Sequence, residues 1–386
     1  MRKRSPATVF GVTLVGFCAF LDMYATQPML PMFMRAFHAS EISVSLTISA
    51  LVLAVALAAP LVGPIADSVG RKRIIVAANL LVSIPTFAAA HSSTLRALIW
   101  WRFAQGLCLP GIFAVAIAYI SEEWSDGGAG VAMAAYVTGN VVGGFCGRWF
   151  SGLAAQHFGW PSAFIVLGAL NLAGGLSVWA LLPASTRFAP AESALHSLRA
   201  LEEHLRNARL LGAFGTGFAV LFSMVAAFTY VTFYLAAPPF GLNTAALGSV
   251  FFVYLLGVVI TPASGRLIDR LGSRTALTLA MAFSSLGIIL TLVPTLWAVV
   301  LGLALSSTGV FVAQSSSATY VGQAAHGARA GAAGLYLTFY YVGGACGAAI
   351  PAYLWAAGGW AACVALIVAV QMAAILTARL TWRLAR

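Results

Sequence analysis

Long apolar runs separated by short polar segments cover almost the whole chain. A helix that crosses the hydrocarbon core of a bilayer needs about 20 mostly apolar residues. Runs of this kind predict twelve transmembrane helices, at residues 9–30, 44–65, 74–90, 98–123, 131–153, 163–182, 212–236, 246–264, 275–293, 297–320, 331–354 and 360–380. In the first run, Pro28 and Pro31 predict a break or bend near its end. The pattern indicates an all-α membrane protein.

The polar segments show that the two halves of the chain repeat each other. Residues 63–73 read Gly-Pro-Ile-Ala-Asp-Ser-Val-Gly-Arg-Lys-Arg, and a related segment at 265–274 reads Gly-Arg-Leu-Ile-Asp-Arg-Leu-Gly-Ser-Arg. The fifth run also matches the eleventh, 200 residues later, at Tyr136 and Tyr336 and at several glycines. Six helices per half give both halves the same orientation, so we predict two parallel-repeat bundles, residues 1–183 and 211–386.

Residues 184–210 form the longest polar stretch and a natural boundary between the halves. Leu195, Leu198 and Leu205 are spaced to share one helical face, as in an amphipathic helix on the membrane surface. A solvated linker explains the stretch equally well.

Composition supports the membrane interpretation and gives its orientation. Hydrophobic residues make up 61% of the 386 residues and charged residues only 8%, so the bilayer must solvate most of the surface. The net charge of +11 is unevenly placed, because all but four of the 21 lysines and arginines fall in loops on one predicted side. This bias predicts cytoplasmic termini in a cell inner membrane and argues against nucleic acid as a partner.

Three charged residues lie well inside predicted helices: Asp22, Arg102 and Arg148. Such charges are costly in a bilayer and normally face a partner or a watery cavity. All three fall at similar depths in the outer half and could pair. A permanent ion pair would only fix helix packing, but the protonation of a buried acid depends on its solvation and on neighbouring charges. We therefore favour proton coupling through Asp22 and Arg102.

The loop pattern Gly-x-x-x-Asp-x-x-Gly-Arg-Lys resembles the signature of the major facilitator superfamily. The resemblance implies the major facilitator fold and a gate in which the loops clamp the two halves together on the cytoplasmic side. The gating residues it assigns are Gly63, Asp67, Gly70, Arg71, Lys72, Gly265, Asp269, Gly272 and Arg274. Asp67 ends its helix, where the helix dipole disfavours a negative charge, so it should bond to Arg71, Lys72 or a facing helix. Ser273 replaces the first arginine of the second copy, which predicts a weaker clamp.

Arg102, Gln105 and Gly106 share one helical face, because residues three and four apart are neighbours on a helix. The pattern resembles the fourth-helix signature of proton-coupled exporters, in which the arginine is implicated in proton transfer. The signature loops, Asp22 and the glycine pattern of the fifth helix resemble most the drug:proton antiporter branch of the family. The alternative is that Arg102 snorkels to the outer interface.

Glycines form a stripe on the fifth helix and recur on the eleventh. Small residues at four-residue spacing let helices approach closely, so we assign packing roles to Gly139, Gly143, Gly147, Gly343 and Gly347. In the family, a glycine-rich fifth helix is associated with export. This chain lacks the Gly-Pro pair of that signature, since Phe145 follows Gly144.

Arg148 breaks the repeat, because the matching position is Ala348. We expect it to contact the polar or anionic end of a substrate and to favour neutral, zwitterionic or anionic compounds over dications. Other polar or aromatic candidates for the lining are Gln105, Tyr24, Tyr136, Gln314 and Tyr340. A single tyrosine can equally mark a membrane interface.

The sequence has no phosphate-binding loop, no nucleophile triad and no metal-ligand spacing among its five cysteines. We expect no enzyme activity, no metal and no cofactor. The partners predicted are a small-molecule substrate, a proton and the bilayer, with the chain as a monomer. The function predicted is proton-driven export of small amphipathic compounds by alternating access. The alternatives are a proton symporter, a sugar or metabolite exporter, and a receptor or scaffold, which would not need repeated gating loops.

Overall fold

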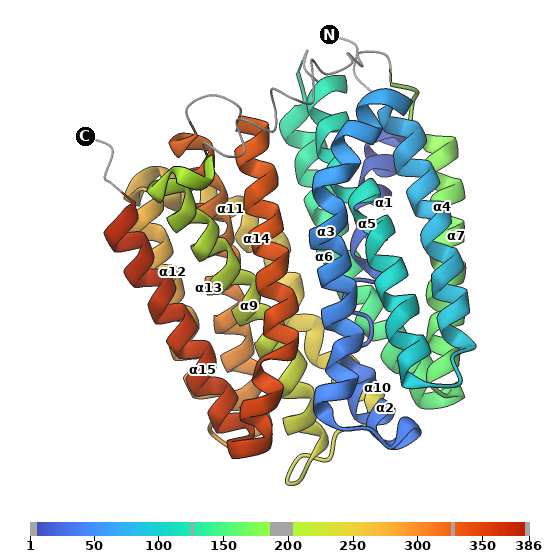
Figure 1. Ribbon diagram of the computed structural model, residues 1–386, viewed down its shortest axis with the longest axis vertical. Coiled ribbons are helices and arrows are strands. Elements are labelled where there is room, and N and C mark those ends of the chain that lie inside the picture. The colour runs from blue at the N-terminus through green and yellow to red at the C-terminus, as the bar shows by residue number, and fades with distance from the viewer. Residues whose placement is uncertain (1–5, 125–126, 186–203, 326–328, 383–386) are drawn as a thin grey trace. The chain divides into compact units, whose positions relative to one another are not determined.

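A computed structural model describes residues 6–124, 127–185, 204–325 and 329–382, and every regular element in this part is a helix (Figure 1). The first half contains α1 (Pro6–Leu21), η1 (Gln27–Met29), α2 (Leu30–Phe37), α3 (Glu41–Val69), α4 (Arg71–Ala90), α5 (Leu95–Glu123), α6 (Ala129–Phe158) and α7 (Trp160–Leu181). The second half contains α9 (Ala208–Ala236), α10 (Thr244–Val250), η2 (Phe251–Leu255), α11 (Leu256–Leu271), α12 (Ser273–Leu290), α13 (Leu296–Ala324), α14 (Arg329–Ala349) and α15 (Pro351–Thr381).

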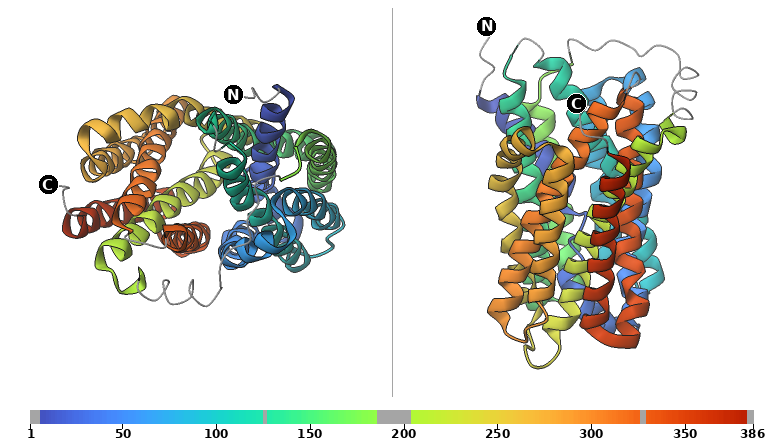
Figure 2. Two further views of the ribbon diagram at one scale, coloured as in Figure 1. Left: turned by 90° about the horizontal axis from the view of Figure 1, so that it is seen from above. Right: turned by 90° about the vertical axis from the view of Figure 1, so that its left-hand side faces the viewer.

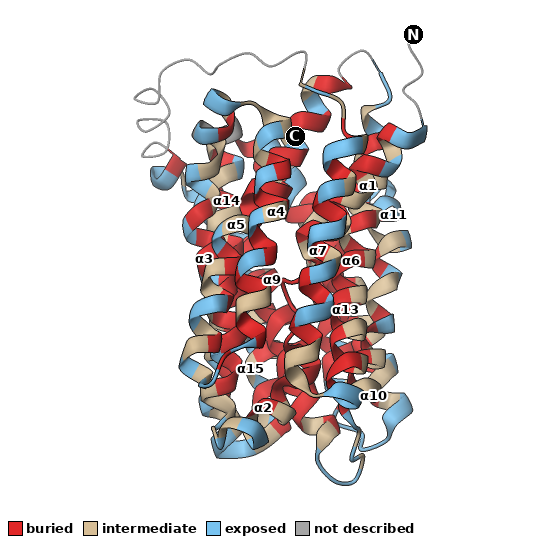
Figure 3. Cartoon of the chain, turned by 90° about the vertical axis from the view of Figure 1, so that its right-hand side faces the viewer, coloured by how far each residue is buried: buried red, intermediate tan, exposed pale blue. Residues whose placement is uncertain are grey.

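Ten helical segments of the described chain are long and apolar enough to cross a membrane. The shorter apolar α1 and the 21-residue α14 occupy the two remaining positions of the predicted twelve. Large apolar side chains are exposed on the outer helices, for example Leu81 and Ile84 of α4 and Trp179 of α7. Figure 3 shows exposed positions alternating with buried ones along α4 and α7. Exposed apolar faces of this kind need lipid as their solvent, so the chain is a multi-pass membrane protein.

Contacts divide the chain into two compact units. The first comprises residues 1–192 together with 243–251, and the second comprises 193–242 together with 252–386. The short α10 thus packs within the first unit, against α6, although the rest of its segment belongs to the second. Most of the predicted linker, including Leu195 and Leu198, lies outside the described residues.

Each unit contains the same set of helix pairs. In the first unit α1 packs on α6 and α7, α3 on α5, and α4 on α5 and α7. In the second unit α9 packs on α14 and α15, α11 on α13, and α12 on α13 and α15. In the left view of Figure 2 many helices of each unit are seen nearly end-on. This correspondence, helix by helix and in the same chain order, is that of two parallel repeats and matches the predicted fold class.

The first spanning segment differs from the prediction, because its helix ends at Leu21 and not near residue 30. Pro28 and Pro31 have no N–H to donate, and they lie in the first turns of η1 and α2, where an N–H has no intrahelical partner. After Leu21 the chain forms tighter turns, in which the Ala25 N–H donates to the Asp22 carbonyl at 3.3 Å. We call residues 22–26 the break segment. The counterpart helix α9 has no proline and runs unbroken.

The boundary between the last two segments also differs slightly from the prediction. Helix α14 ends at Ala349, and the chain continues as the start of α15 before it kinks at Gly358 and Gly359. Gly359 has φ +58°, and Gly159, which lies 200 residues earlier, has φ +83°. Both glycines precede a tryptophan that begins the last helix of its half, so the turn is repeated as well.

Candidate functional site

Arg102 of α5 is buried and reaches the break segment. Its Nη2 donates to the backbone carbonyls of Asp22 and Met23, at 2.8 and 3.1 Å. Its Nε donates to the Thr47 carbonyl at 3.1 Å and its Nη1 to Gln105 Oε1 at 2.6 Å. Backbone carbonyls freed inside a membrane must find donors within the protein. Arg102 therefore stabilises the end of α1 in its broken form, and its side chain does not reach the outer interface.

The Asp22 carboxylate lies at the centre of a buried polar network. Its Oδ2 accepts hydrogen bonds from Asn171 Nδ2 of α7 and, at 3.3 Å, from Thr86 Oγ1 of α4. Thr86 Oγ1 accepts in turn from Gln105 Nε2 at 2.8 Å. Asp22 Oδ1 has no hydrogen-bond partner in the described part of the chain. Through these side chains the carboxylate is connected to α4, α5 and α7 at once.

Arg102 contacts the backbone of residue 22 and not its carboxylate. Among the described residues no ion pair joins the Asp22 carboxylate to Arg102, whose donors go to carbonyls and to an amide oxygen. The carbonyls of Asp22 and Met23 compete successfully because the end of α1 leaves them without the donors of a continued α-helix. Another carbonyl of the break segment, that of Ala25, accepts from Ser151 Oγ of α6 at 2.7 Å.

Arg148 of α6 lies beside the same break segment, and only 1% of its surface is exposed. Its Nε donates to Gln27 Oε1 at 2.7 Å and its Nη1 to the Gly144 carbonyl at 2.6 Å. The guanidinium carbon lies 4.9 Å from the ring centroid of Tyr24 and 4.8 Å from that of Phe251. These partners are neutral, and aromatic faces attract cations. Arg148 is thus held as a cation between two rings.

The remaining lining candidates are spread over both units. Tyr136 donates its hydroxyl to the Phe113 carbonyl at 3.2 Å, a contact that joins α6 to α5. In the second unit Tyr340 is buried against Tyr341, and Gln314 of α13 is half-buried. The structure therefore brings Asp22, Arg102, Gln105, Arg148 and Tyr24 close to one short segment of the first unit, whereas Gln314 and Tyr340 belong to the other unit.

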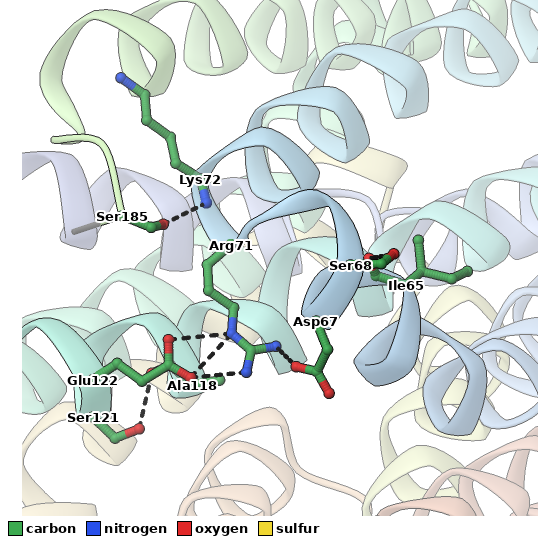
Figure 4. Close-up of polar contacts among 9 residues, drawn as sticks. All are labelled: Ile65, Asp67, Ser68, Arg71, Lys72, Ala118, Ser121, Glu122 and Ser185. Atoms are coloured by element: carbon green, nitrogen blue, oxygen red, sulfur yellow. Dashed lines mark hydrogen bonds and ion pairs between the residues drawn. The ribbon is translucent and has the colours of Figure 1, made fainter. Parts of the chain in front are cut away.

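The first signature loop forms a charged cluster within the first unit (Figure 4). Arg71 pairs with Asp67, one helical turn before it, across the Gly70 turn. On its other side the Arg71 guanidinium binds Glu122 of α5, with Nη2 2.8 Å from Oε1. The Lys72 backbone N–H donates to Ser185 Oγ at 3.2 Å. Gly70 has φ +102°, which residues with a Cβ rarely adopt, so this tight turn requires glycine.

The second signature loop keeps the turn but lacks the charged cluster. Gly272 has φ +76° and separates α11 from α12 as Gly70 separates α3 from α4. Asp269 is exposed and forms no ion pair with a described side chain. Ser273 stands where the first copy has Arg71, and its hydroxyl cannot replace a guanidinium fork.

Glycines lie where helices of each bundle approach most closely. A Cβ on Gly143 or Gly147 would collide with the backbone of α1, at Phe17 and Leu21. A Cβ on Gly343 or Gly347 would collide with the corresponding backbone of α9, at Phe218 and Phe222. Gly139 is similarly tight against α1, at Thr13. The correspondence places Ser223 of α9 where α1 has Asp22.

Sequence reasoning missed Thr86, Asn171 and Glu122. Asn171 had a usable signal, because it is an amide in the otherwise apolar run 163–182. Thr86 had none, since threonines are common in membrane helices and its role depends on which face of α4 it occupies. Glu122 lies near the end of the predicted span 98–123, and its contact with Arg71 joins residues 51 apart in the sequence.

Two parallel bundles with buried charges at a broken helix define a membrane transporter, and the comparisons with known proteins agree. The sequence matches the Major Facilitator Superfamily over residues 12–347, with a second match over 237–386. The MFS-type transporter YybF of Bacillus subtilis is 32% identical over 379 residues, which cover 97% of this chain and 94% of YybF. The inner membrane transport protein YnfM of Escherichia coli is 32% identical over 379 residues, which cover 97% of this chain and 91% of YnfM.

In fold, the chain is similar to the crystal structure of the nucleoside transporter NupG, with a TM-score of 0.78 at 14% identity. That match covers 98% of this chain and 99% of NupG. The chain belongs to the major facilitator superfamily, and it is a transporter and not an enzyme.

Proposed function

We propose that the protein is a proton-coupled antiporter of the drug:proton branch that exports small amphipathic organic compounds by alternating access. In this proposal the protein is an efflux protein of the YnfM-like kind. The observation that carries it is the buried Asp22 carboxylate, which receives hydrogen bonds from neutral donors on α4 and α7. A buried carboxylate held this way can exchange a proton when its solvation changes.

The break in α1 provides a link between that proton and helix movement. Protonation of Asp22 removes a buried charge and changes the hydrogen bonding of its carboxyl group with Asn171 and Thr86. The carbonyl of the same residue is held by Arg102. A change in the carboxyl group therefore alters the contacts of residue 22 with α4, α5 and α7, all of which pack against α1.

Arg148 is the proposed contact for the polar or anionic end of a substrate. Its neutral partners Gln27, Tyr24 and Phe251 keep its positive charge within a buried aromatic environment. A substrate with an anionic or strongly polar group can take the place of Gln27 or of a ring. Gln105, Tyr24, Tyr136, Gln314 and Tyr340 complete the proposed lining.

The proposed topology has both termini in the cytoplasm and the chain as a monomer in the cell inner membrane. This topology rests on the bias of lysines and arginines toward one side. The same bias places the charged cluster of Asp67, Arg71 and Glu122 at the cytoplasmic ends of its helices. This cluster and the second signature loop, at residues 265–274, are the proposed cytoplasmic gate.

Flux measurements in proteoliposomes test the function. Purified protein is reconstituted, a pH gradient of either sign is imposed, and uptake is followed over a panel of amphipathic compounds. For an antiporter, a substrate accumulates against its gradient only when the lumen is more acidic than the outside. Accumulation with an alkaline lumen would instead show symport. Uptake that ignores both gradients would reject proton coupling.

A further inference from the structure

Two buried oxygen atoms in the Asp22 network lack a donor. They are Asp22 Oδ1 and Asn171 Oδ1, and they belong to residues that already share one hydrogen bond, from Asn171 Nδ2 to Asp22 Oδ2. Both side chains are almost completely buried. Buried acceptors without donors are rare in proteins and each one calls for a physical reason.

One additional proton on Asp22 would let these two oxygens share a hydrogen bond. A protonated carboxyl group carries an O–H donor beside its second oxygen, and a primary amide carries an N–H donor beside its carbonyl oxygen. The two groups are therefore complementary at two points when the acid is neutral. With the acid ionised, only the N–H···O bond can form and the amide oxygen stays without a donor.

We propose that Asn171 is a positioning residue that holds Asp22 in its protonated form, and that the conformation described here is the proton-loaded one. In this form Asp22 Oδ1–H donates to Asn171 Oδ1 while Asn171 Nδ2–H donates to Asp22 Oδ2. Loading forms one O–H bond with a proton taken from water, and release breaks the same bond. The inference rests on the proposed proton coupling and adds the residue that holds the proton.

The positive charge of Arg102 interacts with Asp22 and by itself favours the ionised acid, so the assignment is carried by the two buried oxygens without donors. Arg102 of α5 points its donors at carbonyls and at Gln105, and Arg148 of α6 holds Gln27 and Gly144. The other titratable side chains near Asp22 are the thiols of Cys18 on α1 and Cys108 on α5. From α4 the contact is the hydroxyl of Thr86, and the charged residues of that helix lie at its first turn.

The second unit contains a matched position that separates this role from simple packing. Gln371 lies 200 residues after Asn171, at the same place in the last helix of its half, and is equally buried. Its Nε2 donates to Ser284 Oγ at 2.9 Å and its Oε1 accepts from Ser285 Oγ at 2.6 Å. Both ends of this amide are satisfied by neutral hydroxyls. Gln371→Leu is thus the control for loss of a buried amide.

Infrared difference spectroscopy on the reconstituted full-length protein is the test. The signal is the C=O stretching band of a protonated carboxyl group, assigned to Asp22 by its loss in Asp22→Asn. In Asn171→Leu we expect this band to move to higher frequency, because the carbonyl loses the N–H bond that weakens it. In Gln371→Leu the band stays in place. Asn171→Ser serves as a second variant if the leucine variant does not fold, and it should give a smaller shift of the same sign.

An Asp22 band at the same frequency in both Asn171 variants would overturn the inference and leave proton coupling intact. A shift of equal size in Gln371→Leu would also overturn it, because packing alone would then account for the change. If the wild-type protein shows no carboxyl band that Asp22→Asn removes at any pH where it is stable, the proposed proton coupling itself fails.

Discussion

Arg102 binds the backbone of Asp22 and not its carboxylate: the Nη2 atom lies 2.8 Å from the Asp22 carbonyl oxygen. The two residues are therefore coupled through the shape of the chain. Arg102 stabilises the non-helical backbone of the break segment through its carbonyls. In this conformation the Asp22 carboxylate contacts Thr86 of α4 and Asn171 of α7. Substitution of Arg102 should therefore affect the stability of the fold, whereas substitution of Asp22 should affect proton coupling.

Arg102→Lys should lower stability, although it keeps the charge. Lysine lacks the guanidinium fork, so it cannot satisfy the carbonyls of Asp22, Met23 and Thr47 together. A hydrogen bond that involves a charged group contributes about 1.5–3 kcal/mol, so each such bond lost lowers stability by about this amount. Unfolding in detergent, followed by thermal denaturation, measures the loss. Arg96→Lys, an exposed change on the same helix, is the control. Equal stability of the two variants would contradict the proposed role of Arg102.

Gly143→Ala should destabilise the first bundle, because the added Cβ would meet the backbone of Phe17 in α1. Overpacking of this kind costs about 1–3 kcal/mol. Gly130→Ala lies on the same helix, where nothing is within 4 Å of the added Cβ, and should be neutral or stabilise by up to about 1 kcal/mol. The same thermal measurement compares them. If Gly130→Ala were the more damaging change, the close α1–α6 packing would be wrong.

Asp67→Asn should favour inward-open conformations, because it removes one of the two carboxylates that hold Arg71. Asp269→Asn should do less, since Asp269 forms no ion pair with a described side chain. Distances between spin labels on the cytoplasmic ends of the two halves report the change. An unshifted distance distribution in Asp67→Asn, or an equal shift in both variants, would count against the clamp.

Arg148→Ala should weaken binding of anionic and zwitterionic compounds relative to cationic ones. The substitution removes the cation between Tyr24 and Phe251 and reproduces the residue found at the matching position, Ala348. A ligand series that varies only in charge, measured by equilibrium binding, tests the change. Tightest wild-type binding by a dication, or an unchanged charge preference in the variant, would end the idea of Arg148 as an anion contact.

The repeat and the spanning helices could be predicted from the sequence because both rest on local pattern. Apolar run length gives the spans, and Gly70 and Gly272 mark equivalent turns by spacing alone. The break after Leu21 could be placed only approximately. Pro28 and Pro31 favour the start of a new helix near them, but the residue at which the preceding helix ends depends on Arg102 and Ser151, which supply donors from distant segments.

The sequence predicted the charged members of the candidate site and two neutral ones, Gln105 and Tyr24, but not Thr86 or Asn171. Asp22, Arg102 and Arg148 stand out because charge is rare in a bilayer. Their partners could not be predicted, because a pairing such as Asp22 with Asn171 spans 149 residues and depends on which face each helix turns inward. The possible pairing of Asp22 with Arg102 did not include the backbone acceptors that a broken helix exposes, and Arg102 donates to these.

The most direct test of the account is a proton flux measurement on Asp22→Asn. Asparagine has nearly the same shape and can bond to Asn171, so the variant should fold and still carry substrate down its gradient. We predict that it loses all uphill transport driven by a pH gradient and all substrate-driven change in lumenal pH. Ser223→Ala, at the matching position of α9, should keep both. Uphill transport by Asp22→Asn with an unchanged pH profile would contradict the account.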